Sequence, residues 1–147
     1  MQILRILVLG GVAATATAQT TTGPDVVAVR SVVDGDTIRV AYYGTVQLAG
    51  IRAPKTERRG DGGLAEQSRQ RLEELVGHHF VWLEFPTRSR STAYVKLQDG
   101  TSINAILVSD GLARVSGRPT GIHGEELLRA EERAKSARVG IWSLQMR

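Results

Sequence analysis

Arginine dominates the positively charged side chains of this sequence, and its chemistry is the most distinctive that the chain offers. Of the 19 lysine and arginine residues, only Lys55, Lys96 and Lys135 are lysine, and the formal net charge is +4. The planar guanidinium group suits two-point contacts with phosphate or carboxylate. A polyanionic partner is therefore one interpretation. A compositional preference for arginine without functional meaning is the other, and the count alone favours it.

Two carboxylates stand close together in the segment Asp34-Gly35-Asp36. Asp-Gly is a frequent turn sequence between strands. Asp34 is therefore interpreted first as a turn residue, and the alternative is that it supports a neighbouring ligand-binding carboxylate. The three histidines, His78, His79 and His123, lack the spacing of metal ligands and are interpreted as cap or surface residues.

The composition limits the architecture and excludes several classes of chemistry. A chain of 147 residues with 41% hydrophobic residues and only 4 prolines can form one packed domain and is not typical of disorder. It has no cysteine, which excludes disulfides, thiolate metal sites, thiol nucleophiles and lipid attachment through cysteine. The domain must therefore be stabilised by its core alone.

The first residues have the pattern of an export signal. Arg5 precedes a short apolar run, and Ala16-Thr17-Ala18 supplies small residues for a signal peptidase. The run is shorter than the roughly 20 apolar residues of a membrane span, and an uncleaved anchor is the alternative. We expect a signal peptide over residues 1–18, a polar tether over 19–24, a folded domain over 25–144 and a secreted or periplasmic location.

The hydrophobic pattern predicts five strands with one helix after the third strand and two helices at the end. The expected strands begin at Asp25 and then cover Thr37–Tyr43, Thr45–Ile51, His79–Phe85 and Thr92–Leu97. The first helix carries an apolar stripe from Leu64 to Val76, the second follows the N-cap Ser102, and the third covers Glu125–Arg138. This order fits an α+β, mainly β fold. The expected architecture is a five-stranded antiparallel Greek-key barrel of the oligonucleotide-binding (OB) type with three helices.

Several segments together carry a family resemblance that extends in order from Val29 to Trp142. They are Asp34-Gly35-Asp36-Thr37, Val46–Pro54, Asn104–Val115 and Glu126–Trp142. In this set the chain resembles the thermonuclease, or staphylococcal-nuclease-like, family. The resemblance implies a five-stranded barrel with three helices, in agreement with the pattern of the elements.

The resemblance also implies a chemistry. In active members a calcium ion lies between carboxylates, a glutamate activates water against a phosphodiester, and two arginines stabilise the phosphorane. Such groups answer the need to place a nucleophile and to stabilise growing negative charge on phosphate oxygens.

Transfer of these roles to the present sequence gives a mixed result. Asp36 matches the first calcium-binding aspartate, and Arg90 matches the second catalytic arginine. The first catalytic arginine is replaced by Gln47, the second calcium-binding aspartate by Arg52 and the general-base glutamate by Lys55. Two of these replacements reverse the charge, and calcium requires several oxygen ligands, most of them anionic.

These substitutions lead to specific expectations for the site. The hypothesis for Arg52 is that its guanidinium pairs with Asp36 in place of the metal, and the alternative is that it points into solvent. Lys55 cannot act as a base near neutral pH without a large fall in its pKa, which leaves Glu57 as a replacement base if the loop rearranges. The candidate catalytic residues are thus Arg90 and Glu57, and the candidate metal ligand is Asp36.

A basic surface is expected around the same mouth of the barrel. The candidate anion-binding residues are Gln47, Arg52, Lys55, Arg88 and Arg90, joined by Arg58, Arg59 and Arg118. The family's nucleotide-stacking tyrosines are absent at Thr87-Arg88 and at Gly117-Arg118-Pro119, so phosphate contacts must carry binding. A solvated basic face without function is the alternative.

The favoured interpretation is an exported thermonuclease-like protein that binds single-stranded DNA, RNA or another polyanion. Its calcium-dependent phosphodiesterase activity is expected to be lost or strongly weakened. The alternatives are an active endonuclease, with calcium as cofactor, and an envelope protein-interaction module. A monomer that does not contact membrane after signal cleavage is expected.

Overall fold

The computed structural model describes residues 25–55 and 63–146, with side chains up to 144. The predicted signal peptide, the tether and the predicted base Glu57 lie outside these ranges, as do Arg58 and Arg59. Within the described ranges, no helix combines the length and the apolar character needed to cross a membrane.

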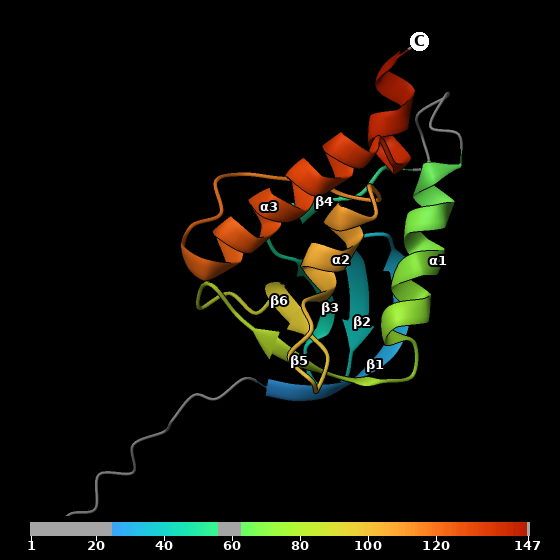
Figure 1. Ribbon diagram of the computed structural model, residues 1–147. Coiled ribbons are helices and arrows are strands. Elements are labelled where there is room, and N and C mark those ends of the chain that lie inside the picture. The colour runs from blue at the N-terminus through green and yellow to red at the C-terminus, as the bar shows by residue number, and fades with distance from the viewer. Residues whose placement is uncertain (1–24, 56–62, 147) are drawn as a thin grey trace, which may run out of the picture.

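Five strands close into a barrel in the order β1-β2-β3-β6-β5 (Figure 1). Their bounds are Asp25–Asp34 for β1, Thr37–Val40 for β2, Gly44–Leu48 for β3, Phe80–Glu84 for β5 and Thr92–Lys96 for β6. The prediction of a five-stranded OB-type barrel is confirmed. The expectation of a wholly antiparallel set is wrong, because β3 and β6 run parallel through the pairs Gln47–Thr92 and Leu48–Ala93. One helix and two strands separate these two partners in the chain, which permits a parallel pairing.

Two predicted strands end earlier than their composition suggested. β2 stops at Val40, and the two following tyrosines lie in the turn to β3. β3 stops at Leu48, and the chain then turns at Gly50, which has a φ of +72°. A Cβ on Gly50 would also lie 2.8 Å from Cδ1 of Leu127. After this turn, β4 (Ile51–Arg52) leaves the barrel and pairs with β7 (Arg114–Val115).

Three helices and a final 3₁₀ turn complete the fold. They are α1 (Leu64–Val76), α2 (Ile103–Ser109), α3 (Gly121–Ala137) and η1 (Gly140–Met146). In Figure 1, α1 runs along the side of the barrel next to β1, and α2 packs between α1 and α3. The predicted N-cap of α2 is confirmed, since Ser102 Oγ accepts a hydrogen bond from Ala105 N. α3 begins four residues before the expected Glu125, because its glycine-containing first turn carries little helical signal.

The core fills the barrel and continues beneath the helices. Alternate residues of each strand point inward, so Ile38, Val46, Val81 and Val95 are completely buried. The predicted stripe of α1 is confirmed: its buried residues are Leu64, Ser68, Leu72 and Val76. This packing fixes the ends of β1, β2 and β3, where the site residues lie.

Candidate functional site

The turn between β1 and β2 places two carboxylates at one end of the barrel. Asp34 Oδ1 accepts a hydrogen bond from Asp36 N at 3.1 Å, as expected for a turn-forming aspartate. Asp36 itself is completely buried. Its carboxylate accepts hydrogen bonds from Thr37 Oγ1 at 3.0 Å and from Ala53 N at 2.8 Å. The turn role predicted for Asp34 is therefore present, and Asp36 is held in one orientation.

The ammonium group of Lys55 bridges these two carboxylates. Its Nζ lies 2.9 Å from Asp34 Oδ2 and 2.8 Å from Asp36 Oδ1. The hypothesis that Arg52 pairs with Asp36 is wrong: the cation beside Asp36 is Lys55. The physical reason is the alternation of β4, in which Ile51 faces the core and Arg52 is exposed.

The contacts between Asp34 and Lys55 favour the charged form of both side chains. Burial raises the pKa of Asp34, but hydrogen bonds from Lys55 and from the backbone of Asp36 outweigh it and lower the pKa to about 2. Burial lowers the pKa of Lys55, yet its hydrogen bonds to Asp36 and Asp34 raise that pKa above its ordinary value. Lys55 is therefore an ammonium ion at neutral pH.

Gly35 allows α1 to pack directly against this turn. A Cβ at Gly35 would lie 2.1 Å from Oγ of Ser68 and 2.8 Å from Cβ of Ala53. The buried hydroxyl of Ser68 in turn donates to the carbonyl of Leu112 at 2.8 Å. Because Gly35 has no side chain, Ser68 of α1 can pack directly against the turn that carries Asp34 and Asp36.

Asn104 holds the far side of the site in a way that sequence reasoning did not find. It is completely buried on α2, where its Nδ2 donates to the carbonyl of Ala49 at 2.8 Å and its Oδ1 accepts from Val95 N at 2.9 Å. These bonds tie β6 to the turn between β3 and β4, and this turn leads directly into Arg52 on β4 and then to Lys55. The available signal was an amide within an otherwise apolar helix, because a buried amide must be hydrogen-bonded.

The predicted anion-binding residues divide into two groups. Gln47 is the β-ladder partner of Thr37 and Thr92, and it therefore lies beside the aspartate turn together with Arg52 and Lys55. The guanidinium of Arg90 instead contacts the carboxylate of Asp25 and the hydroxyl of Tyr43, the latter at 3.0 Å.

The guanidinium of Arg90 is therefore directed toward the turn of the β2–β3 hairpin, although the next residue, Ser91, accepts a hydrogen bond from Gln47 N. It packs over the rings of Tyr43 and Phe85, at 5.2 and 4.9 Å from their centroids. Tyr43 precedes Gln47 by four residues, roughly 13 Å along an extended strand. The structure thus does not bring the predicted catalytic Arg90 to the aspartates. Arg88 and Arg118 are exposed.

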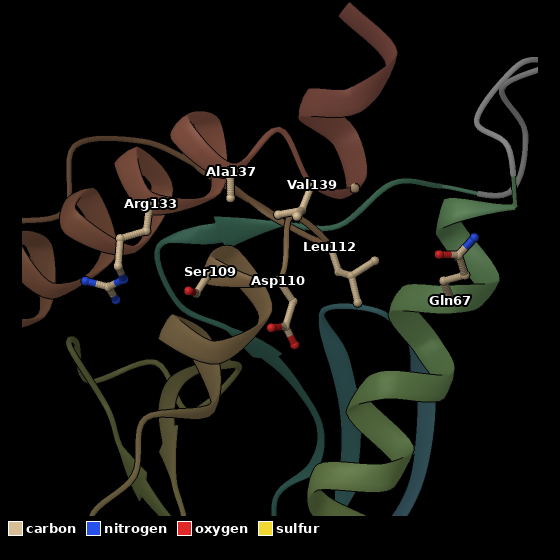
Figure 2. A pocket seen from close by; sticks show the side chains of 8 residues that line it. Gln67, Ser109, Asp110, Leu112, Arg133, Ala137 and Val139 are labelled. Atoms are coloured by element: carbon tan, nitrogen blue, oxygen red, sulfur yellow. The ribbon is translucent and has the colours of Figure 1, made fainter.

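An open pocket of about 440 Å³ lies elsewhere, between α1, the end of α2 and the end of α3 (Figure 2). Side chains of Gln67, Asp110 and Arg133 line it together with Leu112 and Val139. Asp110 is paired with Arg71 at 2.8 Å. The described lining contains none of the predicted site residues, so this pocket is separate from the aspartate turn.

The comparisons with known proteins agree with this arrangement. The family model "Staphylococcal nuclease homologue" matches residues 45–144. The chain belongs to that family. This relationship supports a nuclease-like function. The matched range contains all four of the candidate residues Gln47, Arg52, Lys55 and Arg90.

Curated members of the staphylococcal nuclease family resemble the chain over most of its length. It is 34% identical over 123 residues to "SPbeta prophage-derived endonuclease YokF" and 32% identical over 123 residues to "Endonuclease YncB", both of Bacillus subtilis (strain 168). It is 31% identical over 129 residues to "Micrococcal nuclease" of Shigella flexneri. Each match covers 76% of this chain, but 42%, 58% and 70% of these proteins respectively. The chain thus spans about half the length of the first two.

The calcium ion implied by the family does not fit the residues found here. Lys55 Nζ occupies the space between Asp34 and Asp36, where a cation would have to meet both carboxylates. Arg52, which replaces the family's second aspartate, adds a further positive charge and no oxygen ligand. No group of three or more histidine, aspartate and glutamate residues suited to a metal exists within residues 25–55 and 63–146. A calcium site requires several anionic oxygen ligands, and the described residues do not supply them.

Proposed function

We propose that this chain is a nuclease-fold protein that binds nucleic acid through phosphate contacts, with calcium-dependent cleavage lost or strongly weakened. The observation that carries the proposal is the Lys55 ammonium, which lies 2.8 Å from Asp36 and 2.9 Å from Asp34. This internal cation balances one of the two negative charges that would attract a metal ion and lies between the two carboxylates. Export to the periplasm or the medium is part of the proposal and is supported by the pattern of residues 1–18.

Three further features support the loss of catalysis. A raised pKa keeps Lys55 protonated, so it cannot accept a proton from water as a general base must. Gln47 is neutral and cannot provide the charge that an arginine would give to a phosphorane. Arg90 is committed to Asp25.

Binding of nucleic acid is supported by the exposed cations that remain. Arg52, Arg88 and Arg118 are exposed, and neither metal nor base is needed to contact a phosphate. Such contacts are insensitive to base sequence. They weaken steeply as the salt concentration rises, because the release of counterions from the nucleic acid then gains less entropy.

The test combines digestion and gel-shift of single-stranded DNA and RNA by the purified protein, with calcium or with a chelator. We expect retention of both nucleic acids without cleavage, and the same retention in either solution. The Asp36→Ala variant is the control for contaminating nuclease. Cleavage that requires calcium and disappears in Asp36→Ala would contradict the proposal.

An active endonuclease is the second candidate, because two relatives at 34% and 32% identity are named endonucleases. This function would need a replacement base, for which the sequence offers Glu57. Calcium-dependent cleavage that is lost in Glu57→Gln and unchanged in Glu74→Gln, an exposed residue on α1, would support it.

A further inference from the structure

Two arginines face each other across the small sheet that flanks the aspartate turn. Arg52 on β4 and Arg114 on β7 are direct cross-strand partners, and both are exposed. Directly opposite residues project from the same face of a sheet, with Cβ atoms about 5 Å apart. Like charges in such a pair repel each other, so an anion between them would relieve the repulsion. We propose that Arg52 and Arg114 together bind one phosphate group of a nucleic-acid strand, an inference that rests on the proposed function.

The side chain of Arg114 packs against an aromatic ring. Its guanidinium carbon lies 4.5 Å from the ring centroid of Trp142. A cation–π contact uses the face of the guanidinium and leaves its N–H edge available. On the same ring, Lys135 Nζ lies 4.9 Å from the centroid. Trp142 therefore holds Arg114 in place without neutralising its charge.

The carboxylates near the two arginines are bound to other groups. Glu131 accepts a hydrogen bond from Val115 N at 2.9 Å and pairs with Lys135 at 3.3 Å. Asp34 and Asp36 are paired with Lys55. Within residues 25–55 and 63–146, neither Arg52 nor Arg114 has an ion-pair partner. In the proposed site these two guanidinium groups, which start from directly opposite positions of the β4–β7 ladder, contact one tetrahedral anion together.

The location connects this site to the nuclease-like end of the barrel. Arg52 immediately precedes Ala53, whose amide donates to the carboxylate of Asp36. A strand whose phosphate rests between Arg52 and Arg114 would pass beside the half-exposed ammonium of Lys55. Phosphate is the ligand that the geometry favours, because its oxygens can accept hydrogen bonds from two guanidinium groups at once.

The test measures binding of a fluorescent single-stranded dT oligonucleotide by anisotropy over a series of salt concentrations. The variants are Arg52→Gln and Arg114→Gln, and the matched control is Arg129→Gln, which removes an equal charge from an exposed position on α3. Each test variant should weaken binding about tenfold and reduce the salt slope by about 1. Arg52→Lys should recover part of the loss, since it keeps the charge but not the two-point contact.

Trp142 offers a second, local measurement. The chain has two tryptophans, so a Trp82→Phe background leaves Trp142 as the single tryptophan reporter. Its emission should change and saturate with the oligonucleotide, and the substitution Arg52→Gln should move the midpoint of this change to an oligonucleotide concentration about tenfold higher. Circular dichroism confirms the fold of each variant, and Arg52→Gln is at an exposed position where folding is not at risk.

The outcomes separate the site from the proposed function. A Trp142 response to inorganic phosphate alone, with no oligonucleotide binding, would support the two-arginine site for a free phosphate and contradict the proposed function. Oligonucleotide binding that both arginine variants retain at the level of Arg129→Gln would contradict the site and leave the proposed function intact. Absence of both signals would contradict both.

Discussion

The ammonium of Lys55 lies 2.8 Å from the carboxylate of Asp36, a residue with no exposed surface. A buried carboxylate is costly unless it is paired or hydrogen-bonded. Here Lys55 completes a set that also includes Thr37 Oγ1 and Ala53 N. Lys55 thus serves as a structural counterion for a buried carboxylate.

Replacement of Lys55 by glutamine should destabilise the protein at neutral pH. The change removes the cation from two neighbouring carboxylates, and because Lys55 is half-exposed we expect a loss of about 1–3 kcal/mol. Without Lys55 the two neighbouring carboxylates repel each other. The loss of stability should shrink as the pH falls toward 4, because protonation of one carboxylate removes this repulsion. Urea denaturation at pH 7 and pH 4.5 measures both effects.

Lys96→Gln is the control, since Lys96 makes an exposed 3.6 Å contact with Glu84. It should cost less than about 1 kcal/mol. Equal losses in the two variants would show that Lys55 makes no special contribution.

Asp34 should make the stability of the protein depend on acid pH. Its pKa in the folded state is about 2, against an ordinary value of 3.8. Between these values the unfolded chain binds more protons, so stability falls as the pH is lowered through this window. Above about pH 4 the contribution is fully present. Urea midpoints between pH 5 and pH 2 should fall less steeply for Asp34→Asn than for the parent, and parallel curves would contradict the pairing with Lys55.

Much of the fold could be predicted because its signals are local. Alternation identified the strands, and the stripe on α1 and the N-cap Ser102 were visible in short windows. The parallel pairing of β3 with β6 could not be predicted in this way, since Gln47 and Thr92 are brought together by the whole intervening chain. Gly50, where the chain turns after β3, packs closely against Leu127 of α3, a residue far along the chain that no local window includes.

The resemblance predicted that Asp36, Arg52 and Lys55 lie near one another, but it did not predict which of these side chains pair. In the structure Lys55 lies beside Asp36, and Arg52 is exposed. The partner of Asp36 depends on which face β4 presents, and that face is fixed by its ladder with β7. Arg90 has a long side chain that could turn either way, and Asp25 with the ring of Tyr43 decides its direction.

Gly35 should not tolerate a side chain. In Gly35→Ala the added Cβ would meet Ser68 Oγ at 2.1 Å and Ser68 Cβ at 2.6 Å, so α1 must move away from the aspartate turn. Overpacking of this kind costs about 1–3 kcal/mol. Thermal unfolding measures the loss. A Gly35→Ala/Ser68→Gly double variant should be more stable than the sum of its single changes, and strict additivity would contradict direct contact.

Restoration of the family's carboxylates should create calcium binding. The Arg52→Asp/Lys55→Glu variant removes the internal cation and adds two anionic groups next to Asp36, which supplies the hard oxygen ligands that calcium prefers. Calcium should raise the melting temperature of this variant relative to chelator, as expected for a ligand that binds only the folded state. The parent and Lys55→Gln should show no such shift. A parent protein that calcium stabilises equally would contradict the role assigned to Lys55.

Cleavage should require the further change Gln47→Arg, because charge on the phosphorane remains unstabilised without it. Assays of both variants therefore separate metal binding from phosphodiester chemistry.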